Sequence, residues 1–150
     1  MKKIVILENI RSAYNVGNVI RTADALWWDV WMTWYTPAPH DNPRVWKSAL
    51  WAEEYVSLQS FVTTEQAINA ARNVWCTMIA AEITSQAKSL TNYTAFNGEN
   101  IAIVFGNEVV WVEPETLSQV DEVVFIPMQW HKESLNVWQT AAIFMWELGK

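Results

Sequence analysis

The chain has 150 residues, of which 51% are hydrophobic, and its 10 Lys and Arg against 16 Asp and Glu give a formal net charge of −6. This length and composition predict one folded domain over residues 1–150 and exclude a disordered chain. The single cysteine, Cys76, excludes a disulfide framework and a multi-cysteine metal site. The acidic balance argues against broad electrostatic binding to nucleic acid but leaves room for a local basic patch.

Short apolar runs alternate along the chain with helical patterns, which predicts an α/β fold with a mostly parallel sheet. Strands are expected at residues 3–7, 30–35, 76–81, 101–105 and 123–126. Helices are expected at residues 16–26, from a capping box at 63–66 to about residue 73, and at 134–148. Residues 36–43 contain three prolines and are expected to form a rigid loop.

The last predicted helix, residues 134–148, has almost no polar face. A helix that is apolar all round is buried on more than one side. Because the helices of so small a domain lie at its surface, we expect one side of this helix to face another subunit. A central core helix is the alternative interpretation.

Nothing in the sequence indicates export or membrane insertion. The apolar run after the two N-terminal lysines ends at Glu8, which is too short for a signal peptide. No apolar stretch approaches the roughly 20 residues that a membrane span needs. We therefore expect a cytoplasmic protein with no membrane partner.

The motifs of several enzyme classes are missing. His40 and His131 lie far apart without a metal-ligand pattern, so we interpret both as loop histidines and expect no metal site. No GxSxG elbow, Walker loop or GxGxxG motif follows a predicted strand. A Rossmann-type cofactor site is therefore unsupported.

The first notable polar segment, residues 9–25, joins the first strand to the first helix. Asn15 stands where a helix N-cap would satisfy a free backbone N–H. Arg21 follows within an otherwise apolar and small-residue helix, so its guanidinium is expected to meet an anion or a carboxylate. A ligand anion and a structural salt bridge with Asp24 or Glu108 are equally good interpretations.

Two further segments place polar residues after apolar strands. The strand at 101–105 ends in Gly106-Asn107-Glu108, and the strand at 123–126 leads through a loop to Ser134-Leu135-Asn136. The carboxyl ends of parallel strands are where α/β sheets bind ligands. Gly106 allows a ligand to approach the backbone closely, and Glu108 either orients a cationic group or caps the turn.

Together these residues resemble the SpoU (TrmH-type) branch of the SPOUT superfamily, whose members are RNA ribose 2′-O-methyltransferases that use S-adenosylmethionine. Residues 15–25 resemble the family's N-x-G-x-x-x-R-T-A-D-A motif, and residues 106–108 resemble its G-N-E motif. Ile126-Pro127-Met128 and Ser134-Leu135-Asn136-Val137 resemble its paired I-P-M and S-L-N-V motifs, and residues 47–54 are similar as well. The three motifs occur in the family's order, and the resemblance covers nearly the whole chain.

The resemblance implies a mostly parallel sheet flanked by helices with a deep C-terminal trefoil knot. It also implies a homodimer, formed through the C-terminal helix, whose active sites draw on both subunits. The methyl donor S-adenosylmethionine would be held largely by backbone groups of the loops after the strands. The residues implied to line its site are Ala81, Gly106, Ile126, Met128, Leu135 and Asn136.

The implied reaction transfers a methyl group to a ribose 2′-hydroxyl, a weak nucleophile whose proton must leave. In the family, the arginine that matches Arg21 has this activating role. A guanidinium is a poor base, so electrostatic stabilisation and phosphate positioning are equally good accounts. Arg11 is the candidate contact to an RNA phosphate, and the sulfonium donor makes a metal unnecessary. The residues expected to orient Arg21 and the ribose are Asn15, Glu108, Ser134 and Asn136.

The chain departs from the family at its tryptophans, which number 11 against only 4 glycines. Five of them stand where SpoU-like sequences usually have glycine: Trp27, Trp51, Trp75, Trp111 and Trp130. Divergence with loss of the donor site, deliberate glycine replacement, and a UGA codon read as tryptophan in place of glycine each explain the pattern. We favour the third explanation.

Three functions are compatible with the sequence. The leading one is methylation of a ribose 2′-hydroxyl in tRNA or rRNA. The alternative is a catalytically impaired, knotted RNA-binding dimer in which Trp111 and Trp130 block the donor site. A small-molecule methyltransferase is the third, and the net charge of −6 favours it.

Overall fold

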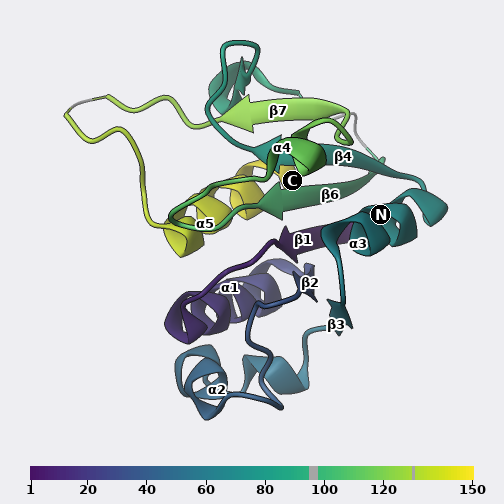
Figure 1. The fold of residues 1–150 in the computed structure, drawn as a ribbon, viewed down its shortest axis with the longest axis vertical. Coiled ribbons are helices and arrows are strands. Elements are labelled where there is room, and N and C mark those ends of the chain that lie inside the picture. Colours follow the sequence, from purple (N-terminus) through teal and green to yellow (C-terminus); the bar gives the residue numbers. More distant parts are fainter. Residues whose placement is uncertain (95–97, 130) are drawn as a thin grey trace.

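The computed structural model describes residues 1–94, 98–129 and 131–150 (Figure 1). Within these residues, seven strands form one sheet in the order β3-β2-β1-β6-β4-β7-β5, and every neighbouring pair is parallel. This confirms the predicted α/β fold with a parallel sheet. The strands are β1 (Lys3–Leu7), β2 (Asp29–Thr33), β3 (Leu58–Phe61), β4 (Cys76–Ala81), β5 (Lys88–Ser89), β6 (Asn100–Phe105) and β7 (Glu122–Phe125).

Helices cover both faces of the sheet. The helices are α1 (Ala13–Leu26), α2 (Pro43–Ala49), α3 (Thr64–Asn73), α4 (Pro114–Leu117) and α5 (Val137–Leu148), with 3₁₀ turns η1 (Ala52–Glu54) and η2 (Leu90–Asn92). Buried residues of α1, α2 and α5 share one hydrophobic cluster with the sheet, and those of α3 share another, on which the partly buried Leu117 of α4 packs. Figure 1 shows α3 and α4 on the near side of the strands and α5 behind them. The sheet is therefore buried on both faces, as its continuous apolar strands predict.

The central strands agree with the sequence most closely. The bounds of β1 and β4 are those expected, and β6 and β7 each begin one residue earlier than expected. The strand expected at 30–35 ends at Thr33, because the Thr33 carbonyl accepts a hydrogen bond from Thr36 N at 2.8 Å and closes a turn. The helix pattern that starts at Thr63 is confirmed as α3, with the Thr63 side chain accepting from Gln66 N.

The starts of two helices differ from the prediction. Helix α1 begins at Ala13 because Ser12, whose Oγ accepts from Asn15 N at 3.2 Å, is its N-cap. The prediction that Asn15 caps the helix is therefore wrong. Its side chain instead donates a hydrogen bond to Glu108. Helix α5 begins at Val137 and not at 134, because Asn136 is its N-cap.

The segment between β2 and α3 contains structure that the sequence did not predict. Helix α2 begins at Pro43, which lies at the first helical position, where proline is well tolerated. The expected proline-rich loop thus ends at Asn42. Strand β3 was also missed, because it is an edge strand of four residues with no continuous apolar run.

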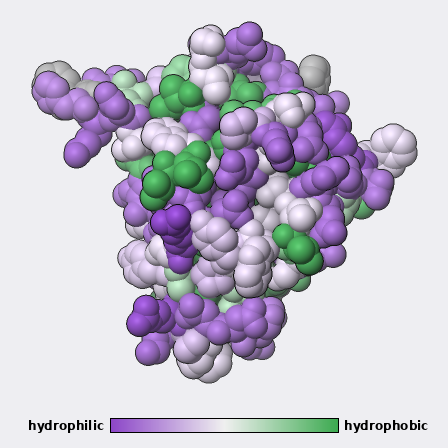
Figure 2. Space-filling model, in the orientation of Figure 1, coloured by the Kyte–Doolittle hydropathy of each residue, from purple (hydrophilic) through white to green (hydrophobic). Residues whose placement is uncertain are grey.

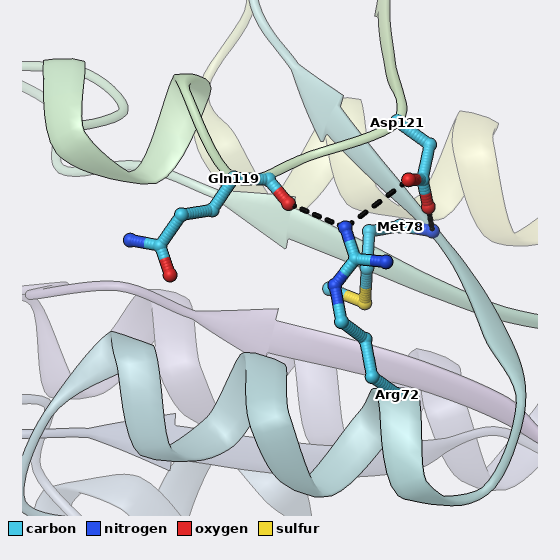
Figure 3. A network of polar contacts seen from close by, with 4 residues as sticks. All are labelled: Arg72, Met78, Gln119 and Asp121. Atoms are coloured by element: carbon cyan, nitrogen blue, oxygen red, sulfur yellow. Dashed lines mark hydrogen bonds and ion pairs between the residues drawn. The ribbon is translucent and has the colours of Figure 1, made fainter.

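A polar network joins α3 to β4 and to the segment that precedes β7 (Figure 3). Arg72 Nη2 donates to the Gln119 carbonyl at 2.7 Å and to Asp121 Oδ1 at 3.1 Å. The other oxygen of the Asp121 carboxylate accepts from Met78 N at 2.8 Å. These contacts hold the amino end of β7 against β4, so that the carboxyl ends of both strands are fixed side by side.

The last helix leaves part of its apolar surface uncovered. Ala141, Phe144 and Met145 of α5 are buried, whereas Ile143 and Trp146 are exposed. On the face shown in Figure 2, hydrophobic side chains form separate spots among hydrophilic ones. No helix among the described residues is long and apolar enough to cross a membrane.

Candidate functional site

A cavity of about 350 Å³ opens where β4, β6 and β7 end and α5 begins. This is the carboxyl edge of the parallel sheet, where α/β proteins bind ligands. The residues predicted for the methyl-donor site all line it, and so do three of the four predicted orienting residues. The lining includes Ala81, Gly106, Glu108, Ile126, Met128, Ser134, Leu135 and Asn136. The sequence segments at 106–108, 126–128 and 134–137 thus meet at one cavity.

Gly106 lies against the chain's own backbone. A Cβ atom added at Gly106 would lie 2.2 Å from the carbonyl carbon of Trp111 and from Val112 N. Real Cβ atoms essentially never approach a heavy atom so closely. Glycine is therefore required here so that the segment at 111–112 can close one wall of the cavity.

Asn107 holds the turn after β6 in place. Its Oδ1 accepts from Val109 N at 2.7 Å, and its Nδ2 donates to the Asn9 carbonyl at 2.7 Å. The Asn107 carbonyl also accepts from Trp111 N at 2.8 Å. Because the Asn107 side chain is buried and bonded on both ends, it fixes the loop after β1 against the loop after β6.

Asn15 and Glu108 form the polar contact between the first and second motifs. Asn15 is buried in the first turn of α1, and its Nδ2 donates to Glu108 Oε1 at 2.7 Å. This bond directs the Glu108 carboxylate, which lines the cavity. The Glu108 carboxylate thus accepts from a side-chain amide at the cavity, which is neither the cationic group nor the turn backbone that the two interpretations proposed.

Arg21 lies outside this cavity. It is exposed on α1 and is absent from the residues that line the cavity. In the part of the chain that the structure describes, its guanidinium forms neither of the ion pairs considered from the sequence, with Asp24 or with Glu108. The interpretation as an internal salt bridge is therefore wrong, and the guanidinium stays available to an external anion.

Tyr35 is a site residue that the sequence analysis missed. Its hydroxyl accepts from Arg11 Nε at 3.2 Å and from Asn107 Nδ2 at 3.2 Å. The bond to Tyr35 raises the pKa of Arg11 above its usual value. Arg11, the predicted phosphate contact, is exposed. The Tyr35 hydroxyl nevertheless connects it by hydrogen bonds to Asn107 in the second motif. No local signal marks Tyr35, because its partners lie 24 and 72 residues away.

Two glutamates beside the motifs were also missed. Glu82 follows β4 and lines the cavity, where its Oε2 accepts from Val112 N at 3.1 Å. Glu8 follows β1 and is buried, and it accepts hydrogen bonds from Thr116 Oγ1 and from Glu113 N. Burial raises the pKa of Glu8 in spite of these bonds. The signal that marks both is an acidic residue directly after an apolar strand.

The remaining residues considered from the sequence are the histidines, the cysteine and the two tryptophans near the cavity motifs. His40 is exposed and pairs with its neighbour Asp41 at 3.2 Å. Among the described residues, no group of three or more His, Cys, Asp or Glu is arranged to hold a metal ion. Burial raises the pKa of Cys76 to about 11. Trp111 lines the cavity, and Trp130 lies outside the described residues.

The fold and the sequence both match known RNA methyltransferases. An AdoMet-bound rRNA methyltransferase from Sinorhizobium meliloti has the same fold, with a TM-score of 0.88 and 20% identity over 97% of this chain and 55% of its own. A protein whose structure concerns 2-OH methylation of C/U34 on tRNA has a TM-score of 0.82 and 21% identity, over 97% of this chain and 93% of its own.

Curated relatives are longer than this chain. The 23S rRNA (guanosine-2′-O-)-methyltransferase RlmB of Acinetobacter baylyi is 27% identical over 147 residues, which are 96% of this chain and 58% of that protein. The chain spans 58–63% of the length of the curated relatives it matches. The model of the family described as the SpoU rRNA Methylase family matches residues 2–146. The chain therefore belongs to the SpoU rRNA methylase family.

Proposed function

We propose that this chain transfers a methyl group from S-adenosylmethionine to a ribose 2′-hydroxyl of tRNA or rRNA, and that the cavity at the carboxyl edge of the sheet is the donor site. The observation that carries the proposal is the meeting of three separate sequence segments at this one cavity. The chain's membership of the SpoU family and the 2′-O activity in its relatives' names support it.

The cavity walls suit the proposed donor. Its volume of about 350 Å³ falls within the roughly 300–1,000 Å³ of small-molecule sites. Leu135 and Phe144 give apolar surface, while the carboxylates of Glu82 and Glu108 suit a ligand with cationic groups. When bound, S-adenosylmethionine supplies a methyl group activated by its sulfonium. The chain's part is to hold the donor by the loops after β4, β6 and β7 and to exclude water from it.

Arg21 is proposed to act on the ribose. An always-charged guanidinium stabilises the developing alkoxide and positions the adjacent phosphate, so that the hydroxyl proton is lost more easily. Asn15 contributes through its bond to Glu108, which lines the cavity. The two polar residues before α5, Ser134 and Asn136, also orient the groups around the hydroxyl. Arg11 contacts an RNA phosphate next to this site.

The proposed active form is a homodimer. Arg21 does not line the cavity of its own chain, and α5 leaves Ile143 and Trp146 exposed. Pairing of two chains through α5 would cover this apolar surface and bring Arg21 of one chain to the cavity of the other. We further propose that residues 1–150 act as one domain and that their C-terminal segment forms the trefoil knot of the family.

The first test is donor binding followed by methyl transfer. Calorimetry with S-adenosylmethionine measures the donor affinity, and tritium-labelled donor with total tRNA and rRNA measures transfer. We expect Arg21→Ala to keep donor affinity but to lower transfer to RNA by at least about a hundredfold, the usual scale for a lost electrostatic group. Arg44→Ala, on an exposed position of α2, is the matched control and keeps both. Equal transfer by Arg21→Ala and the parent would refute the assignment.

One observation supports a second candidate function. Trp111 lines the donor cavity, so the second candidate is a catalytically impaired RNA-binding dimer in which this tryptophan blocks the donor site. This candidate predicts no donor binding by the chain, and binding restored by Trp111→Gly with Trp130→Gly. Binding by the unaltered chain contradicts it.

A further inference from the structure

Four tryptophans adopt a backbone conformation that is normal for glycine and rare for bulky residues. The φ angles are 61° at Trp27, 73° at Trp51, 62° at Trp75 and 66° at Trp111. Besides these, only Asn9 and Leu50 among the described non-glycine residues have positive φ. Asparagine tolerates this region, whereas a large side chain with φ above zero is a genuine outlier. The strain is therefore concentrated in one residue type.

Three of these positions lie just after the end of a helix. Trp27 follows α1, and Trp28 N donates across it to the Ala23 carbonyl at 2.9 Å, which is the hydrogen bond of a glycine-type helix end. Trp75 follows α3, and its N donates to the Arg72 carbonyl at 2.9 Å. Trp51 separates α2 from η1. The surrounding hydrogen bonds thus fix the left-handed conformation independently of the side chain.

Three of the four side chains are too exposed to offset this strain by packing. Trp27, Trp51 and Trp75 are 89%, 75% and 88% exposed. Trp28 and Trp31, by contrast, are buried and have ordinary backbone angles. Tryptophan normally buries much of its large ring. Trp27, Trp51 and Trp75 thus project into solvent from a left-handed backbone, a combination that the buried Trp28 and Trp31 do not share.

We propose that residues 27, 51, 75 and 111 are glycine in the functional protein, encoded by UGA codons that its own cell reads as glycine. Loss of a donor site does not account for Trp27, Trp51 and Trp75, because none of them lines the cavity. Deliberate replacement of glycines would not select the bulkiest side chain at four strained turns. Since some genetic codes read UGA as tryptophan and others as glycine, a reading difference accounts for both the residue type and the positions.

Residue 111 connects this inference to activity, and this part rests on the proposed function. Trp111 lines the cavity, and the backbone of residues 111 and 112 closes against Gly106. Glycine at 111 keeps that backbone path while removing the indole from the cavity wall. We therefore infer that the side chain at position 111 determines how much of the cavity volume is available to the methyl donor.

The direct test is the gene and the protein from its own cell. The proposal predicts UGA at all four codons, and peptide masses that contain glycine at 27, 51, 75 and 111. A UGG codon at any of these positions, or a native peptide that contains tryptophan there, overturns it.

A recombinant test measures the strain. Relief of one left-handed non-glycine residue is expected to raise the melting temperature by about 2–4 °C in a domain of this size, or roughly 6–12 °C for Trp27→Gly, Trp51→Gly and Trp75→Gly combined. Trp46→Gly is the matched control, because Trp46 is also exposed but lies within α2, where glycine weakens a helix. It should lower the melting temperature. A fall for the combined variant overturns the proposal.

The donor test separates this inference from the proposed function. Trp111→Gly should bind S-adenosylmethionine at least about tenfold more tightly than the parent, whereas Trp75→Gly should leave the affinity unchanged. No gain for Trp111→Gly refutes the role of residue 111 in the cavity. Absence of binding by every variant refutes the donor site itself, while the codons and melting temperatures still decide the glycine assignment.

Discussion

Replacing Gly106 by alanine tests the geometry of the cavity wall. The added Cβ would meet the carbonyl carbon of Trp111 and the nitrogen of Val112, both at 2.2 Å. Ordinary van der Waals contact begins at 3.4 Å, so the two backbone segments must separate by more than about 1 Å. Neither neighbour is the free end of a side chain, so neither is able to rotate away.

The expected cost follows from this overlap. Overpacking of a well-packed site costs about 1–3 kcal/mol, and a clash between two backbone segments belongs at the upper end, about 2–3 kcal/mol. For a chain of this length that corresponds to a fall in melting temperature of roughly 4–12 °C. The hydrogen bond from Trp111 N to the Asn107 carbonyl, 2.8 Å long, should open in the variant.

Thermal unfolding and amide hydrogen exchange at Trp111 measure both effects. Gly98→Ala is the control, because a Cβ at Gly98 meets nothing within 4 Å. Its positive φ makes some loss of stability expected, but exchange at Trp111 should stay slow. A Gly106→Ala variant that melts with the parent and keeps Trp111 protected would refute the close approach described for the cavity wall.

Three further predictions concern the polar contacts around the site. Burial raises the pKa of Glu8 above its usual value, so its stabilising contribution is greatest at low pH and is lost as the pH rises through the folded-state pKa. Glu8→Gln, whose amide still bonds Thr116, should therefore gain stability relative to the parent with rising pH in urea unfolding; a pH-independent difference contradicts this. Asn15→Asp puts a second carboxylate against Glu108 and should cost about 1–3 kcal/mol at neutral pH, with recovery on adding Glu108→Gln; an unchanged melting temperature contradicts it. Tyr35→Phe, which removes only the hydroxyl, should weaken RNA binding by roughly three- to tenfold in a filter-binding assay, and unchanged affinity refutes its role.

The sequence predicted the parts of the fold that depend on local apolar pattern. The strands β1 and β4 were predicted to the residue, because each is a mainly apolar run that ends directly before a glutamate. Edge strand β3 and the short helix α2 were missed because short, largely exposed segments carry a weak apolar pattern. The capping residue of α1 was also misplaced, because Ser12 and Asn15 are both good N-caps and only the fold decides between them.

Part of the candidate site could be predicted from where its residues stand relative to the strands. Residues at the carboxyl ends of parallel strands must gather at one edge, so Gly106 and Ile126 could be placed together in advance. Tyr35 could not, because its partners are far apart in the chain and meet only through the fold. The position of Arg21 away from the cavity likewise follows from how α1 packs, which periodicity does not report.

The most direct test of the central claim is the position of the transferred methyl group. Unmodified tRNA and rRNA are incubated with labelled S-adenosylmethionine and with either the chain or its Trp111→Gly variant, then digested to nucleosides and analysed by mass. The account predicts a nucleoside methylated on the ribose 2′-oxygen, formed by at least one of these two proteins and lost on Arg21→Ala. Methylation of a base, or no RNA methylation by either protein, would contradict it.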